Sequence, residues 1–217
     1  MSPNAVFEIP TCSYKEIEDG YGIIIDTISA KKRGGLTIPF YSNIVEGKNF
    51  DFQCRPPVTC RSAEIHVKPH NETLWLERHM HLTQLFIGLG AKESFLMVLG
   101  KPTHQRVDLN EEQRALPDLS NVKAFIIPPG CGVILNLGTW HDFPASLGDT
   151  VTVLTFNSAE VVEALAAMPA PGEMLGQGDV YKIHLETRLG RKITYNFEIT
   201  TTATVDEEKR DENFVCM

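Results

Sequence analysis

The sequence predicts an all-β protein, built as a sandwich or barrel with one or two peripheral helices and a C-terminal β-hairpin. Three observations support this class: short runs rich in β-branched and aromatic residues, Gly, Pro, Asn and Asp between them, and turn signals roughly every eight to twelve residues. The predicted strands cover residues 21–26, 62–67, 73–81, 84–89, 94–100, 124–128, 132–137 and 150–156.

One segment has clear helix character. Residues 158–168 follow Asn157, and either Asn157 or Ser158 can cap the helix. Glu160 lies in the first turn, and Pro169 ends the segment. The sequence therefore predicts a single well-defined helix after the last strand of the main run.

The chain after residue 170 predicts the hairpin. Residues 179–199 alternate in two runs around Leu189-Gly190-Arg191. Val180, Ile183 or Tyr195 would lie on a face that needs cover, and a partner subunit could supply it. This pattern favours a homodimer.

The length and composition indicate one domain. The chain has 217 residues, of which 42% are hydrophobic, enough for a sizeable core. We expect a single domain over residues 1–200. Residues 201–217 are rich in charge and predict a flexible tail.

Charge and hydropathy exclude several classes of partner. The net charge is -8 and no basic run is present, so we expect no nucleic acid partner. No stretch approaches the roughly 18 apolar residues of a membrane helix, and the first thirty residues lack a signal peptide pattern. The expected location is the cytoplasm. The five cysteines are scattered, which is typical of reduced thiols and not of a disulfide framework.

Three polar residues interrupt an apolar stretch in "WLERHMHLTQLFIGLG", residues 75–90. They are His79, His81 and Gln84. Burying a polar group without a partner costs roughly 1–3 kcal/mol, so neighbours or a bound group must satisfy them. A metal ion or a small anionic substrate would do so.

Strand geometry predicts which side chains of this stretch share a face. Alternate residues of a strand share a face, so Glu77, His79 and His81 should point one way and Arg78 the other. A lone strand histidine is usually a satisfied core residue, but an H-x-H pair favours metal ligation. Arg78 is expected to pair with a neighbouring carboxylate.

Two further groups complete the predicted cluster. Gln84 breaks the alternation, so a turn or bulge near residues 82–83 should start a new strand that folds back over the histidines. In "GTWHDF", His141 opens a later strand and offers a third imidazole. Such a set with open coordination positions suits Ni, Zn, Fe, Mn or Co.

These residues resemble a known two-part motif. H-x-H at 79–81, then Gln84, Gly90, Pro128-Pro129-Gly130 and His141, is similar to the motif of cupins, small β-barrels or jelly rolls that hold a metal with three His and one Glu or Gln.

The longer matching segments point to one branch of the cupins. Residues 76–87, 117–144 and 21–26 resemble, in order, stretches of the ureidoglycolate lyase family. The resemblance covers roughly residues 20–160. It implies a homodimer, a divalent metal such as nickel, and cleavage of ureidoglycolate to glyoxylate and urea in allantoin catabolism.

The predicted chemistry assigns a role to each group. His79, His81, Gln84 and His141 would hold a divalent Ni, Zn, Mn or Fe ion, which binds the carboxylate and hydroxyl of the substrate. Glu77 or Asp142 would act as base or acid, although Asp142 could instead cap a turn or orient His141. The remaining predicted substrate-binding residues are Lys68 and Arg61, which would steady the carboxylate, and Trp140, which either packs in the core or walls the pocket.

Other functions stay open at this point. The same ligands could serve an Fe or Mn oxygenase or an isomerase acting on a small carboxylate. A hydrolase of a related amide or amidine, or a non-catalytic metal- or sugar-acid-binding barrel, would also fit. Oxygen consumption and the nature of the released products distinguish these classes.

Overall fold

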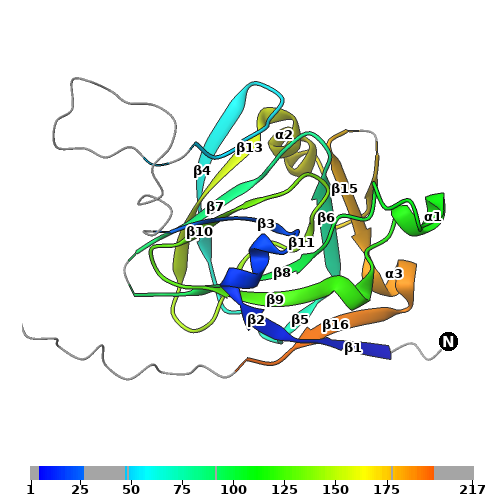
Figure 1. Ribbon diagram of the computed structural model, residues 1–217, viewed down its shortest axis with the longest axis horizontal. Coiled ribbons are helices and arrows are strands. Elements are labelled where there is room, and N and C mark those ends of the chain that lie inside the picture. The colour runs from blue at the N-terminus through cyan, green and yellow to red at the C-terminus, as the bar shows by residue number, and fades with distance from the viewer. Residues whose placement is uncertain (1–4, 27–46, 48, 91, 177, 198–217) are drawn as a thin grey trace, which may run out of the picture.

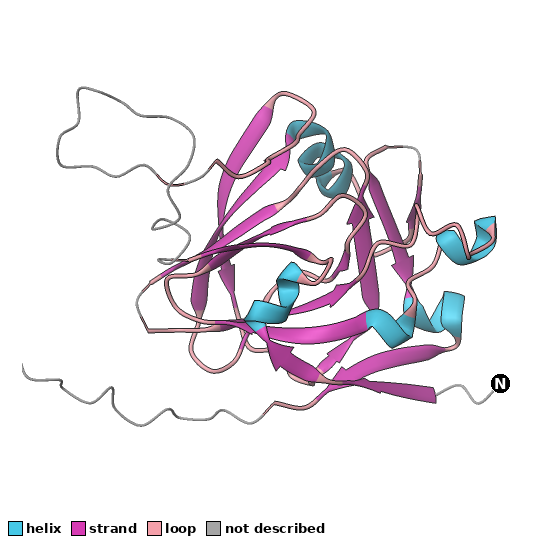
Figure 2. Ribbon diagram, in the orientation of Figure 1, coloured by secondary structure: helices cyan, strands magenta, loops and turns pink. Residues whose placement is uncertain are grey.

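The computed structural model describes residues 5–26, 47, 49–90, 92–176 and 178–197. The tail predicted at 201–217 therefore lies outside the described residues. Strands dominate the described chain, as Figure 2 shows, and the prediction of an all-β fold is confirmed.

Two large sheets face each other and form a sandwich (Figure 1). The first sheet has five strands in the order β3 (Gly22–Ile25), β10 (Gly132–Leu135), β7 (Leu85–Leu89), β13 (Val151–Ser158) and β4 (Val58–Ile65). The second has the order β14 (Met174–Leu175), β15 (Val180–His184), β6 (Trp75–His79), β11 (Trp140–His141), β8 (Phe95–Gly100), β9 (Val122–Ile127) and β2 (Thr11–Ser13), with β12 (Ala145–Ser146) also paired to β8. Within the described residues the sheets do not close into a barrel.

The principal core fills the space between these sheets. β13 alternates buried and partly exposed residues, the pattern of a strand with one face on a core. Its buried face meets that of the opposite sheet. The core includes Phe86, Met97, Leu99, Phe125, Val133 and Val153.

A third, smaller sheet covers the outer face of the second sheet. Its order is β1 (Ala5–Ile9), β16 (Arg191–Tyr195) and β5 (Glu72–Thr73). A second core lies between them and includes Leu76, Val98, Trp140, Ile183 and Tyr195. Because both faces of β8 are covered, all six of its residues are buried. This explains the uninterrupted apolar run at 95–99.

The predicted C-terminal hairpin is wrong. β15 pairs with β6 and β14, whereas β16 pairs with β1 and β5, so the two strands lie in different sheets. Between them the chain forms α3 (Leu185–Leu189). Gly190 ends α3 with a left-handed φ of 67°, which is the work of a helix C-cap and not of a two-residue hairpin turn.

This correction removes one argument for a dimer. Val180, Ile183 and Tyr195, which were expected to need a partner subunit, are buried within the chain at no more than 2% exposure. The homodimer itself stays a prediction.

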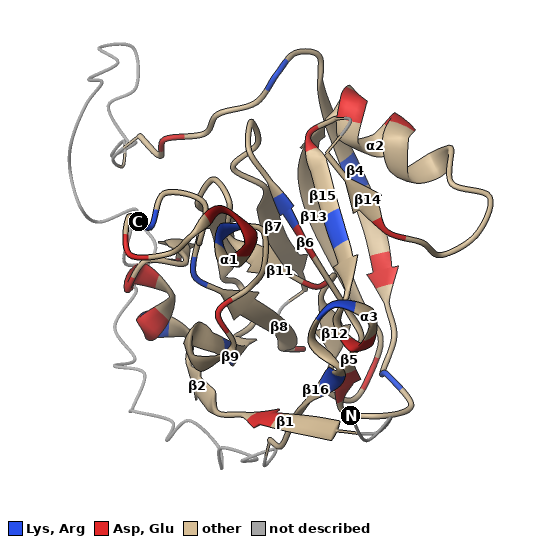
Figure 3. Ribbon diagram, turned by 90° about the vertical axis from the view of Figure 1, so that its right-hand side faces the viewer, with Lys and Arg blue, Asp and Glu red and all other residues tan. Residues whose placement is uncertain are grey.

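The predicted helix at 158–168 is confirmed as α2 (Ala159–Ala166), and the Ser158 side chain caps it by accepting from the Val161 N–H. Besides α3, the sequence did not reveal the other short helical segments of the described chain, which are η1 (Tyr14–Glu18), α1 (Glu111–Arg114) and η3 (Leu119–Asn121). No helix in the described part of the chain has the length and apolarity to cross a membrane. Figure 3 shows acidic and basic segments interleaved over the strands and helices on the side it displays.

Replacing Leu99 with Ala tests the double-sided burial of β8. Leu99 is fully buried, so removing its side chain should lower the free energy of unfolding by about 2–5 kcal/mol. Urea denaturation measures the change. Val107→Ala is the control, because Val107 is 91% exposed and its truncation should change stability by less than about 0.5 kcal/mol. Equal effects of the two substitutions would contradict the proposed packing.

Candidate metal centre

Three potential metal ligands meet on two neighbouring strands. Glu77 and His79 alternate on β6, so both point into the sandwich, and His141 on β11 lies directly opposite Glu77 in the antiparallel register. The Glu77 Oε1 atom is 3.6 Å from His141 Nε2 and 3.9 Å from His79 Nε2. All three ligand atoms lie within 4.8 Å of one another, and this is the one such group found in the described part of the chain.

The cluster is almost completely withdrawn from solvent. His79 and His141 are 2% exposed and Glu77 is 5% exposed, and the two imidazole centroids are 5.2 Å apart. Side chains of this polarity are costly to bury unless a partner satisfies them. The cluster therefore needs a bound group or a matched set of hydrogen bonds.

Hydrogen bonds at the far side of each ring fix which nitrogen faces the cluster. The Nδ1 atom of His79 is 3.3 Å from the Asp179 carbonyl, and that of His141 is 3.0 Å from the Thr139 carbonyl. A carbonyl only accepts, so each Nδ1 carries the hydrogen and each Nε2 keeps its lone pair. Both Nε2 atoms are buried without a hydrogen-bond partner. Two lone pairs are thus aimed at one point.

Gln84 adds a neutral oxygen from the opposite sheet. It directly precedes β7, is 4% exposed, and donates from Nε2 to Asn157 Oδ1 at 2.6 Å. Asn157 in turn donates to Thr155 Oγ1 at 3.2 Å, which fixes the orientation of both amides. The Oε1 atom of Gln84 is left buried and unpartnered, and Gln84 is near enough to His79 to influence its pKa.

The charges around the cluster favour the protonation states that a metal requires. Burial raises the pKa of Glu77, but His141, Lys182 and His79 outweigh this effect and hold it well below its usual value. Burial, and then repulsion from His141, lowers the pKa of His79 to about 4. At neutral pH the carboxylate is therefore charged and His79 is neutral, as metal ligands must be.

A pocket of about 370 Å³ opens beside the cluster. Arg61 on β4 lines it and is exposed, and no carboxylate of the described residues pairs with it. α2 provides an apolar wall. The lining residues are Arg61, Ser62, Ala63, Glu77, Gln84, Phe143, Thr155, Asn157, Val161, Val162, Leu165 and Ala166.

His81 lies outside the cluster, contrary to the expectation that it shares a face with His79. β6 ends at His79, and the Asp179 carboxylate accepts hydrogen bonds from the next two backbone N–H groups, Met80 at 2.8 Å and His81 at 2.7 Å. The alternation therefore stops before His81, whose side chain is exposed.

Asp142 and Lys68 also lie away from the pocket lining. They form an ion pair with each other, and Asp142 additionally accepts from Thr73 Oγ1 at 2.9 Å. Because His141 points into the sandwich, the residues on either side of it point to the opposite face of the sheet. Asp142 is thus held by Lys68 and Thr73 outside the pocket.

Trp140 and Arg78 pack together behind the cluster. Trp140 is fully buried in the second core and donates to Thr103 Oγ1 at 3.0 Å. The Arg78 guanidinium stacks on Trp140 at 4.4 Å and on Tyr181 at 4.8 Å. Arg78 faces away from the cluster as predicted, but in the described chain it contacts these rings, Thr103 Oγ1 and the Arg114 carbonyl instead of a carboxylate.

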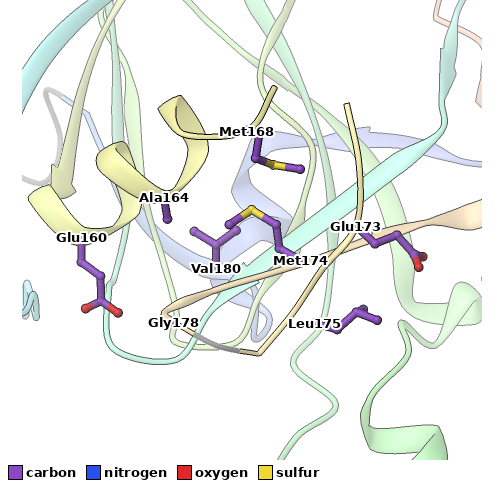
Figure 4. Close-up of a pocket in the computed structure, with 8 residues that line it drawn as sticks. All are labelled: Glu160, Ala164, Met168, Glu173, Met174, Leu175, Gly178 and Val180. Atoms are coloured by element: carbon purple, nitrogen blue, oxygen red, sulfur yellow. The ribbon is translucent and has the colours of Figure 1, made fainter. Parts of the chain in front are cut away.

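A second pocket is larger, at about 640 Å³, but lacks free polar groups (Figure 4). It lies between α2 and the β14–β15 pair. Its two carboxylates already have partners: Glu160 pairs with Arg55 and Glu173 with Arg188. Its other lining residues are Ala164, Met168, Met174, Leu175, Gly178 and Val180.

The unpartnered Nε2 and Oε1 atoms, together with a buried carboxylate, fit a divalent metal. A sandwich of β-sheets with such a cluster between them defines a cupin-type protein. The chain belongs to the ureidoglycolate lyase family of this superfamily, because the ureidoglycolate lyase family profile matches residues 41–170. A comparison with curated proteins finds no match.

Sequence reasoning missed some contributors to the site. Glu77 was expected to act as base or acid, although its alternation with His79 also indicated a shared face. Asn157 was noted only as a helix cap, and Asp179 and Lys182 only as parts of a hairpin. Their roles depend on which strand pairs with β6, and no local sequence signal gives that pairing.

The lowered pKa of His79 predicts acid sensitivity of the metal-free protein. The unfolded chain takes up a proton on His79 near pH 6.5, whereas the folded chain does so only near pH 4. The free energy of unfolding should therefore fall as pH drops from 6.5 to 4, with at most about 3 kcal/mol due to His79. Urea denaturation in the presence of a chelator measures this dependence.

His79→Gln should make the pH dependence of stability shallower over that range. His66→Gln, which replaces an exposed imidazole, is the control and should leave it unchanged. A His79→Gln profile with the wild-type slope would contradict the assigned shift.

Proposed function

We propose that this protein is a metal-dependent carbon–nitrogen lyase that cleaves ureidoglycolate to glyoxylate and urea. The observation that carries the proposal is the convergence of the unpartnered His79 Nε2 and His141 Nε2 with Glu77 Oε1 beside an open pocket. Family membership supports the substrate and the lyase reaction. A cytoplasmic location and a dimer are further parts of this proposal.

His79, His141, Glu77 and Gln84 would hold the metal. This set keeps three of the ligands predicted from the sequence and replaces His81 with Glu77. A divalent ion held there would lower the pKa of a coordinated hydroxyl and would bind the substrate carboxylate. Gln84 would supply a ligand oxygen without adding negative charge, so an anionic substrate would be repelled less than by a second carboxylate ligand.

The reaction requires one proton to move from the hydroxyl of the substrate to the urea nitrogen. The reacting carbon of ureidoglycolate bears a hydroxyl, a carboxylate and a urea nitrogen. Loss of the hydroxyl proton forms the aldehyde C=O, the carbon–nitrogen bond breaks, and the nitrogen gains a proton as urea leaves. Because hydroxyl and nitrogen share one carbon, a single pocket water is sufficient to relay the proton.

The pocket residues position and select the substrate. Arg61 lines the pocket and no described carboxylate pairs with its guanidinium, which supports the proposal that it would bind the substrate carboxylate. Glu77 has a low pKa and is therefore a better ligand than base. Asp142, the other carboxylate proposed as base or acid, is already paired with Lys68.

One observation favours a second candidate. Two histidines and one carboxylate are also the ligand set of non-haem iron oxygenases. An oxygenase acting on a small carboxylate would consume oxygen, whereas the lyase would not. Oxygen uptake by the iron-loaded protein distinguishes the two.

The first test combines metal content with product release. Wild-type protein should retain about one divalent ion per chain and release urea and glyoxylate in equal amounts. His79→Ala and His141→Ala should lose most of the metal and reduce activity at least about 100-fold, because each removes an unpartnered ligand atom. Elemental analysis and coupled assays of both products measure these changes.

His81→Ala is the matched control for this test. The exposed His81 imidazole lies on the same segment but outside the cluster, so its loss should leave metal content and activity near wild type. A loss equal to that of His79→Ala would contradict the assigned ligand set.

A second test addresses substrate binding. Arg61→Met should raise KM for ureidoglycolate about 10-fold or more while metal content stays unchanged, because the charge-assisted contact to the carboxylate is lost. Steady-state kinetics measure this effect. Arg55→Met is the control, since Arg55 pairs with Glu160 outside the pocket lining. An unchanged KM for Arg61→Met would remove Arg61 from the site.

A further inference from the structure

The two oxygens of the Glu77 carboxylate have different neighbours. Oε1 lies 3.6 Å from His141 Nε2 and 3.9 Å from His79 Nε2. Oε2 accepts a hydrogen bond from Lys182 Nζ at 2.9 Å. The carboxylate is therefore divided between the cluster and a lysine.

Lys182 reaches Glu77 because of strand register. β15 pairs antiparallel with β6, and Lys182 is directly opposite Glu77, so both side chains lie on the same face of the sheet. The Glu77 side chain is 7% exposed and that of Lys182 is 26% exposed. A charge-assisted hydrogen bond in such a setting is short and directional.

We propose that Lys182 is a positioning residue that restricts Glu77 to one oxygen in metal binding. This inference rests on the proposed metal dependence. With Oε2 held by the ammonium group, Oε1 alone faces the histidines. The one coordination position that Oε2 would otherwise fill would then stay open for an oxygen of the substrate.

The lysine also contributes charge. It offsets the negative charge of Glu77, so the centre keeps more net positive charge toward an anionic substrate. Loss of this charge alone would strengthen metal binding while weakening substrate binding. The proposal therefore predicts opposite effects on the two ligands.

Lys182 lies outside the segment of the chain that matches the family. The family match ends at residue 170, whereas Asp179 and Lys182 lie beyond it. Asp179 begins the same stretch of chain and accepts from His79 Nδ1 and from the backbone after β6. The chain after the matched segment thus holds two of the proposed ligands in place.

The test uses Co²⁺ as a spectroscopic probe in the full-length, metal-free protein. Lys182→Met should bind Co²⁺ at least as tightly as wild type but show a weaker visible absorption band, because the second Glu77 oxygen joins the coordination sphere. Its kcat/KM for ureidoglycolate should fall about 10- to 100-fold, mainly through KM. Lys182→Arg, which keeps the charge and the donor, should restore the wild-type spectrum.

Lys192→Met is the matched control. Lys192 forms an ion pair with Glu72 between β16 and β5 of the third sheet, with side-chain exposure of 30% and 23%, and neither residue belongs to the cluster or to the pocket lining. This variant should keep the wild-type spectrum and kinetics. Circular dichroism and thermal unfolding accompany each variant, and Lys182→Ala replaces Lys182→Met if the latter does not fold.

Each outcome has a defined meaning. A folded Lys182→Met or Lys182→Ala protein with the wild-type Co²⁺ spectrum overturns the inference. If wild-type protein binds no Co²⁺, both the inference and the proposed metal dependence fail. If the spectrum changes as expected but wild-type protein does not cleave ureidoglycolate, the positioning role stands and the proposed substrate is wrong.

Discussion

The antiparallel pairing of β11 with β6 is the constraint on which the site depends. It sets His141 opposite Glu77, so ligands from distant parts of the sequence share one face of a sheet. A one-residue shift of register would turn His141 into the outer core and bring Trp140 into the sandwich. Trp140 resists that shift, because its ring is buried against Arg78 and its Nε1 has a partner.

Packing on the outer face of the second sheet supports the cluster on its inner face. The Arg78 guanidinium lies between the rings of Trp140 and Tyr181, so residues of β6, β11 and β15 contact one another directly behind the cluster. Each of these residues is followed in its strand by a residue whose side chain lies on the inner face. The three inner residues are His79, His141 and Lys182. The rigidity that a metal site would need is thus provided by packing on the face of the sheet away from the cluster.

Local patterns in the sequence were enough to predict the central strands of the two large sheets and much of the cluster, but not the short strands β1 and β2. Alternation on β6 aligned Glu77 with His79, and the broken parity at Gln84 indicated a strand that returns over them. The prediction failed for His81, because the Asp179 carboxylate ends the strand at His79 through backbone hydrogen bonds. It failed for the hairpin because β16 pairs with the N-terminal strand, a contact between the two ends of the domain that local pattern does not encode.

α2 has a consequence for how this enzyme can diversify. Ser158, the last residue of β13, caps the helix, and Asn157 before it orients Gln84, while Val161, Val162 and Leu165 wall the pocket. Substitutions on that helical wall would reshape the cavity without altering any atom of the cluster. Evolution could therefore change which ligand the pocket admits by changing aliphatic side chains alone, with the cluster of Glu77, His79 and His141 inherited intact.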